Sequence, residues 1–306
     1  MEYQALKWEV RENPNRPGEK CIGVITFNRP EALNAVDVRM RVELDILCDQ
    51  IRHNNHLKVI VLTGEGRGFS AGGDLKSEAD PLGAGTDPDF DMGNFGPYKE
   101  LAHLFFNDLR HQVLQRAFRK LEDLPQITIA AINGPAVGIG LEICTLCDLR
   151  IASDRAKLGE VAVPAGFLPE SGGARNLPKL VGVGKALELI LTGRIIEADE
   201  AERIGLVERV IPHDDLIDEV MALAGQISSN PYLSVRYAKE LVKMYWNANR
   251  SQEGWDREFG AIQEITRTGD CREGMRAFLG KRPADYRGPY YENWPFDDGG
   301  GDGGNG

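Results

Sequence analysis

The feature that most constrains the fold is the alternation of short β-branched runs with longer helical stretches. Runs that end in turn residues occur at Cys21–Asn28 (CIGVITFN), Val59–Gly64 (VIVLTG) and Ile127–Gly134 (ITIAAING), and another follows at Leu149–Asp154 (LRIASD). Residues Val38–Asn54, between the first two runs, carry apolar side chains at helical spacing. Strands separated by helices favour a parallel sheet with helices packed outside, so the sequence predicts an α/β fold.

The second half of the chain is mostly helical after Gly173, with apolar residues at three- and four-residue spacing. With 306 residues, 42% of them hydrophobic, the chain can bury one large core with a C-terminal extension. We expect a core over residues 1–212, a helical region over 213–285 and a flexible tail over 286–306. The tail includes DDGGGDGGNG, which cannot bury a core.

The composition of the chain limits which partners it is expected to bind and where in the cell it is expected to lie. A net charge of −11 disfavours nucleic-acid binding, which needs Lys and Arg gathered on one face. The chain has no apolar run near the roughly 20 residues that span a bilayer, and its start resembles neither a signal nor a transit peptide. The odd number of cysteines, five in a long chain, favours reduced thiols over a framework of disulfides. We therefore expect a cytoplasmic protein with no nucleic-acid or membrane partner.

Two glycine-rich loops, GFSAGGDLK (Gly68–Lys76) and NGPAVGIGLE (Asn133–Glu142), share one design. In each, a strand ends, small residues turn the chain and a helix is expected to begin. Such loops can present free backbone N–H groups to a ligand, and two donors converging on one oxygen form an oxyanion hole. The alternative is that the glycines serve only tight turns. Neither loop fits a dinucleotide fingerprint or a phosphate-binding loop.

Cys144 and Cys147 form a C-x-x-C pair that lacks a second pair or a His cluster. We interpret both as buried helix residues, and we predict no metal site. Asp148 is likewise interpreted as structural.

Six segments together resemble the crotonase, or enoyl-CoA hydratase/isomerase, superfamily. In chain order they are NRPEALNAV (Asn28–Val36), FSAGGDLK (Phe69–Lys76), NGPAVGIGLEICTLCDLRIAS (Asn133–Ser153), PESGGARNLPKLVG (Pro169–Gly182), LTGRIIEADEAERIGLVERVIP (Leu191–Pro212) and REGMRAFLGKR (Arg272–Arg282). The resemblance implies a crotonase-like spiral of ββα units with a C-terminal helical trimerisation region. It also implies an acyl-CoA thioester substrate and assembly as a homotrimer or a dimer of trimers.

The matching motifs assign residues to an acyl-CoA site. The two N–H donors that stabilise a thioester enolate fall at Gly73 and Ile139. The residues expected to bind CoA are Ala32, Leu33, Ala71, Asp74, Leu75, Phe278 and Lys281, the last two often acting across a subunit boundary. No cofactor is implied beyond the coenzyme A of the substrate.

The acids depart from the hydratase pattern. Glu142 matches one of the two glutamates of the hydratases, but the position of the second is Ala162. Glu160 is close in sequence, yet a shift that aligned it would break the match at PESGG. Glu170 matches a position where several isomerases carry an aspartate, so we expect it to be the replacement acid or base. Structural alternatives are a helix-start charge for Glu142 and a helix cap for Glu170.

Three functions stay open at this point. The leading hypothesis is reversible hydration of a 2-enoyl-CoA, in which Glu142 and Glu170 share a water. An isomerase that moves a double bond through Glu170 is the first alternative, and a non-catalytic CoA- or partner-binding protein is the second. The Gly-, Pro- and Asp-rich stretch Ser77–Tyr98 is either a surface insertion or a wall of the ligand pocket.

Overall fold

The computed structural model describes residues 3–74, 110–165, 168–247, 260 and 268–286. They belong to two compact units, Met1–Ser228 and Ser229–Gly306. The stretch Ser77–Tyr98 lies outside the described residues. No helix among the described segments is both long and apolar enough to cross a bilayer.

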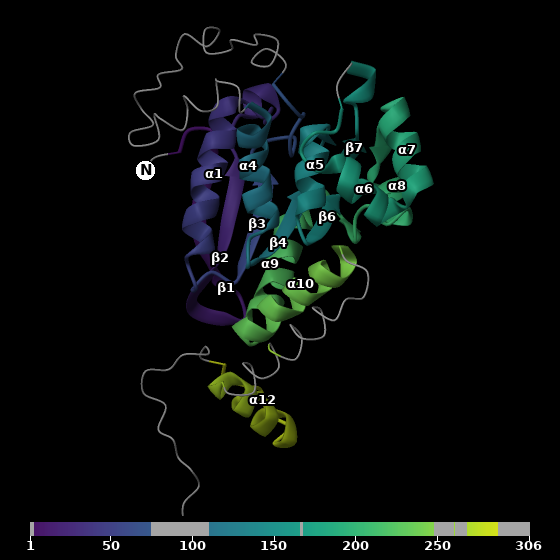
Figure 1. The fold of residues 1–306 in the computed structure, drawn as a ribbon. Coiled ribbons are helices and arrows are strands. Elements are labelled where there is room, and N and C mark those ends of the chain that lie inside the picture. Colours follow the sequence, from purple (N-terminus) through teal and green to yellow (C-terminus); the bar gives the residue numbers. More distant parts are fainter. Residues whose placement is uncertain (1–2, 75–109, 166–167, 248–259, 261–267, 287–306) are drawn as a thin grey trace, which may run out of the picture. The chain divides into compact units, whose positions relative to one another are not determined.

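A six-stranded sheet forms the centre of the first unit, with strand order β1-β2-β3-β4-β6-β9 (Figure 1). Its strands are β1 (Leu6–Asn13), β2 (Arg16–Phe27), β3 (Val59–Gly64), β4 (Ile127–Ile132), β6 (Leu149–Ser153) and β9 (Arg209–Ile211). Strands β1 and β2 pair antiparallel, and all the other pairs are parallel. The predicted parallel sheet is therefore present, with an antiparallel hairpin strand added at one edge.

A second sheet holds the short strands β5 (Ala136–Val137), β7 (Lys157–Gly159) and β8 (Ile196–Glu197), in that order. Along the chain, β4 in the large sheet leads to β5 in the small one, and β6 leads in the same way to β7. Each of these pairs is followed by a helix, α5 (Ile139–Leu146) after the first and α6 (Gly173–Val181) after the second. The strand pairs therefore distribute between two sheets in repeated ββα units.

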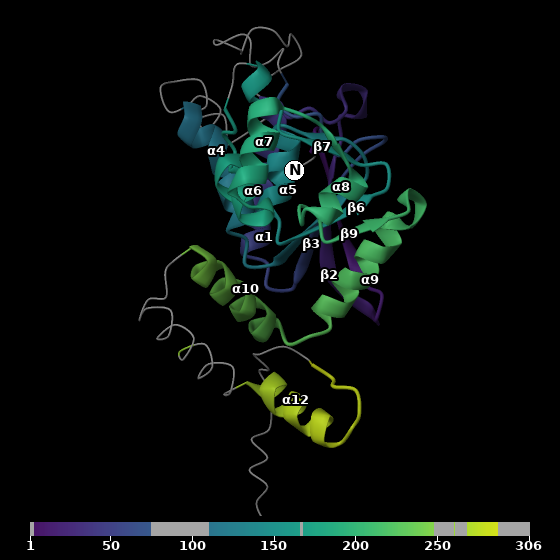
Figure 2. The same cartoon turned by 90° about the vertical axis from the view of Figure 1, so that its right-hand side faces the viewer.

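Apolar residues cover both faces of the large sheet. On one face, Val24, Val61 and Ile129 pack against α9 (Leu216–Ser228), which lies beside β2 and β3 (Figure 2). The other face contacts a larger cluster that includes α1 (Val38–Arg52), α4 (Arg110–Glu122) and α5. Since the strands of a parallel sheet alternate their side chains between two buried faces, nearly every residue of β3 and β4 is apolar.

Helices α7 (Val183–Thr192) and α8 (Ala198–Arg203) follow α6 in the first unit. Its described residues also form 3-10 turns at Pro30–Ala32, Val163–Ala165 and His213–Asp215. The second unit contains α10 (Tyr232–Asn247) and α12 (Gly269–Leu279), and Tyr232, Leu233 and Tyr237 form its own apolar cluster. Helix α9 belongs to the first unit. The division at residue 212 and the tail over 286–306 stay predictions.

Candidate functional site

The two glycine-rich loops lie side by side at the ends of β3 and β4. The first loop pairs with Val36, whose N–H donates to the Gly72 carbonyl at 2.7 Å and whose carbonyl accepts the Asp74 N–H at 3.1 Å. In an extended segment successive N–H groups point to opposite sides, so the Gly73 N–H points away from Val36. Ile139 is the first residue of α5, where helix N–H groups have no intrahelical acceptor. Among the described residues neither N–H has a hydrogen-bond acceptor.

Gly72 keeps these loops in contact. Its φ of 99° is a conformation that side chains rarely adopt. A Cβ atom at this position would lie 2.7 Å from the Val137 carbonyl oxygen and 3.7 Å from the Ile139 nitrogen. The structure thus brings the Gly73 and Ile139 segments together, and the close approach depends on the absence of a side chain at residue 72.

Glu142 lies in the first turn of α5, three residues after Ile139, and it is buried with 1% exposure. Its Oε2 atom accepts the N–H groups of Ser171 at 2.7 Å and of Gly173 at 2.8 Å. Burial raises the pKa of Glu142, the charge of Glu170 raises it further, and the two N–H bonds act in the opposite direction. A buried carboxyl group with a raised pKa can take up and release a proton.

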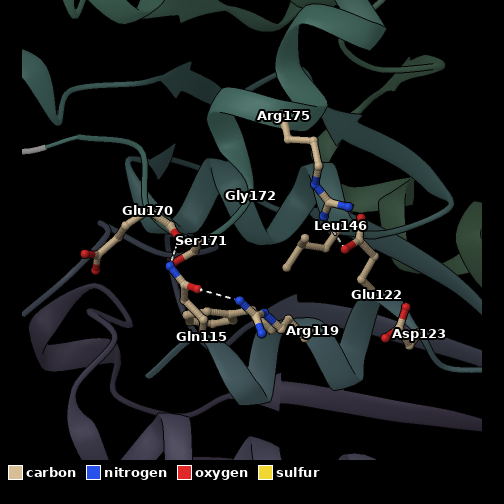
Figure 3. A pocket seen from close by; sticks show the side chains of 10 residues that line it. Gln115, Arg119, Glu122, Asp123, Leu146, Glu170, Ser171, Gly172 and Arg175 are labelled. Carbon is tan, nitrogen blue, oxygen red and sulfur yellow. Dashed lines mark hydrogen bonds and ion pairs between the residues drawn. The ribbon is translucent and has the colours of Figure 1, made fainter. Parts of the chain in front are cut away.

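Glu170 has different surroundings. Its side chain is 37% exposed, and its Oε1 lies 3.8 Å from the Arg41 guanidinium. Its main-chain carbonyl accepts a hydrogen bond from Gln115 Nε2 at 2.9 Å. In Figure 3 the carboxyl group points away from Gln115. Glu142 and Glu170 are close enough for their charges to interact, so the structure brings both predicted acids to one region.

Arg41 was not identified from the sequence. It lies in α1, only 2% exposed, with its guanidinium 5.7 Å from the centre of the Phe118 ring. The sequence held no signal for it, because its burial is set by contacts with residues far along the chain, such as Phe118. A buried guanidinium beside Glu170 provides this acid with a charged neighbour.

A cavity of about 450 Å³ borders the Glu170 loop (Figure 3). It is lined by Gln115, Phe118, Arg119, Glu122, Asp123, Leu146, Glu170, Ser171, Gly172 and Arg175. An ion pair between Arg175 and Glu122 closes one side. The Ser171 segment both borders the cavity and binds Glu142, so the loop before α6 connects the cavity wall to the buried acid.

The residues predicted to bind CoA are partly placed by the structure. Ala71 is exposed, and its N–H donates to the Leu33 carbonyl at 2.9 Å, which brings the AGGDL and PEAL segments together. Ala32 ends the 3-10 turn just before Leu33. The Asp74 carboxylate lies 3.0 Å from the Arg29 guanidinium. The structure therefore brings together two segments of the first unit, one with Ala32 and Leu33 and the other with Ala71 and Asp74.

The other predicted CoA residues are described less fully. Leu75 lies outside the described residues. Phe278 is in α12, and Lys281 is exposed just after that helix, both in the second unit.

The cysteines and Asp148 have structural surroundings. Cys144 and Cys147 are buried free thiols that donate to the carbonyls of Gly140 and Ile143. Asp148 accepts the Thr128 N–H at 2.8 Å, and this contact connects the end of α5 to β4. In the described part of the chain, no group of three or more His, Cys, Asp or Glu side chains is arranged to hold a metal ion.

Comparison with known proteins covers nearly the whole chain. A family model described as enoyl-CoA hydratase/isomerase matches residues 18–91 and 96–289. "Probable enoyl-CoA hydratase echA8" of Mycobacterium tuberculosis is 36% identical over 264 residues, which are 86% of this chain and 93% of that protein. The crotonyl-CoA hydratase of Syntrophomonas wolfei is 34% identical over 88% of this chain and 95% of its own length.

The fold has matches among solved structures as well. The crystal structure of an enoyl-CoA hydratase from Bacillus anthracis superposes with a TM-score of 0.77 at 32% identity, covering 93% of this chain and 99% of that one. The two glycine-rich loops and both predicted acids lie inside the matched ranges.

Proposed function

Because the chain belongs to the enoyl-CoA hydratase/isomerase family, we propose that it catalyses the reversible addition of water to a 2-enoyl-CoA thioester. The supporting observation is the approach of the Gly73 and Ile139 loops one helical turn from the buried Glu142. A thioester carbonyl oxygen between the two N–H groups would gain negative charge as the enolate forms. Donors already in place at that oxygen lower the barrier to the reaction.

The proton transfers are assigned to Glu142 and Glu170. The two carboxyl groups share a water, whose oxygen attacks Cβ while one carboxylate takes its proton. The Cα=Cβ electron pair moves into the thioester to form the enolate, and Cα then receives a proton from the other carboxyl group. The net change is the addition of one water. The reaction moves only protons and water, so the coenzyme A of the substrate is the only cofactor that it requires.

Isomerisation is the second candidate, and the different exposure of the two acids favours it. Glu170 is partly open to the surface whereas Glu142 is closed off. In this version Glu170 alone moves the proton between Cα and Cγ, and Glu142 transfers no proton. The loss of a hydratase glutamate at Ala162 fits this version.

The proposal extends to the assembly and the compartment. We place the chain in a homotrimer or a dimer of trimers in the cytoplasm, with Phe278 and Lys281 contributing to CoA binding.

The test is turnover of crotonyl-CoA and a small panel of linear, branched, cyclic and aromatic enoyl-CoAs in D2O, followed by ultraviolet absorbance and mass spectrometry. Hydration should yield a 3-hydroxyacyl-CoA carrying one deuterium at Cα, whereas isomerisation should move the double bond of a 3-enoyl-CoA. Binding of CoA without proton exchange at Cα, across the whole panel, would identify a binding protein and contradict the proposal.

A further inference from the structure

Glu160 is a buried acid that the proposed mechanism does not use. It is 1% exposed, and its Oε2 atom has no hydrogen-bond partner among the described residues. Its Oε1 atom accepts one long contact, the Ala162 N–H at 3.4 Å. Keeping an ionised carboxylate in such surroundings is unfavourable, because the buried charge loses its hydration and gains almost no hydrogen bonds in return. The geometry therefore favours the neutral form of Glu160.

The small sheet places Glu160 beside the proposed site. Strands β5 and β7 run parallel with Val137 opposite Gly159, and the Gly138 N–H donates to the Gly159 carbonyl at 2.8 Å. Glu160 is therefore the neighbour of Gly159, which is bound to Gly138, and Gly138 is the residue that precedes α5. Glu142 lies in the first turn of that helix, and its carboxyl group interacts electrostatically with the carboxyl group of Glu160.

Hydrogen bonding distinguishes the two acids. Glu142 receives short bonds from two backbone N–H groups, which stabilise a carboxylate. Glu160 has only its single long contact. If the two carboxyl groups together carry one negative charge and one proton, the charge resides on Glu142 and the proton on Glu160.

The nearby charges do not change this assignment. Glu170, from the loop before α6, acts on Glu142. The Arg194 carbonyl lies against Gly159, but the Arg194 guanidinium is bound by Glu188 and Glu200.

On β7 itself, Lys157 pairs with Glu197 of β8. Within the described segments no cation is paired with Glu160, so no neighbouring positive charge favours its ionised form.

We propose that Glu160 and Glu142 form an electrostatically coupled pair that carries one proton, held by Glu160, and that neutral Glu160 is a positioning residue that confines the negative charge of the pair to Glu142. Its kinetic consequence rests on the proposed function, because it concerns the rate at which a thioester enolate forms. A second charge on the pair would oppose the negative charge that develops on the thioester oxygen.

Burial and the charge of Glu142 raise the pKa of Glu160 to about 8. Glu160 is therefore neutral at pH 7 and ionised well above pH 8. We expect kcat/KM of the wild-type protein, which reports groups of the free enzyme, to fall above this pH and to be about tenfold lower at pH 9.

The decisive variant is Glu160→Gln, measured as kcat/KM between pH 6 and 9.5. The amide resembles the neutral acid but cannot ionise. We expect activity at pH 7 within roughly threefold of wild type, since a group that transfers protons would instead cost on the order of 10²–10⁴. The decline above pH 8 should be absent.

Glu160→Asp is the matched control. It restores a carboxyl group at the same position, so the decline at high pH should return. Circular dichroism at each pH confirms that the variants stay folded.

Infrared difference spectra of the wild-type protein provide a readout that needs neither a variant nor turnover. We expect the C=O stretching band of a protonated carboxyl group at pH 7 and its loss on raising the pH to 9.5. Absence of this band would overturn the proposal, even if Glu160→Gln failed to fold.

Three kinetic outcomes are informative. An unchanged decline above pH 8 in Glu160→Gln overturns the proposal, and so does a loss of more than about 100-fold at every pH, which would identify Glu160 as a proton donor to the substrate. A wild-type protein that turns over no enoyl-CoA contradicts the proposed function instead, and in that case the infrared band still tests the pair.

Discussion

Glu142 and Glu170 differ in burial and in hydrogen bonding, so mutation can separate their roles. Glu142→Gln keeps an oxygen that can accept the Ser171 and Gly173 N–H groups and removes only the charge. If the enzyme adds water, this variant and Glu170→Gln should each lower kcat by on the order of 10²–10⁴, and the double variant should lose little more. Stopped-flow hydration of crotonyl-CoA measures both losses.

The isomerase version predicts unequal effects. Glu170→Gln should then stop conversion of 3-enoyl- to 2-enoyl-CoA, whereas Glu142→Gln should leave substantial activity, because Glu142 transfers no proton in that version. Wild-type rates in both variants on a proven substrate would mean that neither carboxyl group takes part.

At the residue scale, sequence alone could find only the acids that lie near a recognisable loop. Glu142 was identified because it follows Ile139 by three residues, which is nearly one helical turn. Arg41 was not found, and Glu160 was considered only as a replacement for the hydratase glutamate. The surroundings of both depend on contacts with distant parts of the chain, namely α4 for Arg41 and β5 for the segment that precedes Glu160. Local spacing contains no information about such contacts.

At the scale of elements, contact between the two glycine-rich loops can be tested at Gly72. Gly72→Ala would place a methyl group 2.7 Å from the Val137 carbonyl oxygen and so push apart the segments that present Gly73 and Ile139. We expect kcat/KM to fall by about 10²–10³, the effect of losing one oxyanion donor. Steady-state kinetics on the best substrate of the panel would measure the fall.

Gly18→Ala is the matched control for Gly72→Ala. Gly18 has a similar positive φ of 88°, but no atom lies within 4 Å of an added Cβ. It should cost roughly 1–2 kcal/mol of stability, through backbone strain, and leave activity unchanged. Equal activity losses in the two variants would show that strain alone explains the result at Gly72.

Helices and strands were predictable where the segment was long enough to show its pattern of apolar residues. The expected helix over Val38–Asn54 forms as Val38–Arg52, and the run at Ile127–Gly134 forms β4. Strand β1 was missed because it is an edge strand with mostly polar, partly exposed residues. Strands β5, β7 and β8 have two or three residues each, too few to show a period.

For the whole molecule, the acidic charge predicts a dependence on local cations. Coenzyme A is itself strongly negative, so binding to a chain of net charge −11 needs positive groups at the site. Lys281 is exposed and available for this role. Lys281→Ala should raise KM several-fold with kcat nearly unchanged, a loss of binding that is equal in the ground and transition states. Initial-rate measurements over a range of acyl-CoA concentrations separate the two parameters.

Sedimentation velocity tests the assembly that this role assumes. A trimer or hexamer is expected, and a monomer at every concentration would contradict a site shared between subunits.

For the whole molecule, the parallel sheet was predictable from the alternation of strands and helices. The division of strand pairs between two sheets came only from the family resemblance, because no local pattern specifies which sheet a short strand joins.

The two N–H groups proposed to bind the thioester belong to the main chain, and this bears on how such a protein can evolve. A substitution at Ile139 changes the side chain but retains the amide. Gln115, Arg119 and Asp123, by contrast, line the 450 Å³ cavity with side chains of different size and charge, so a substitution at one of them changes the cavity itself. If this cavity receives the acyl group, descendants of this chain can change acyl specificity by point substitutions there, while the main-chain groups proposed to stabilise the enolate are inherited with the fold.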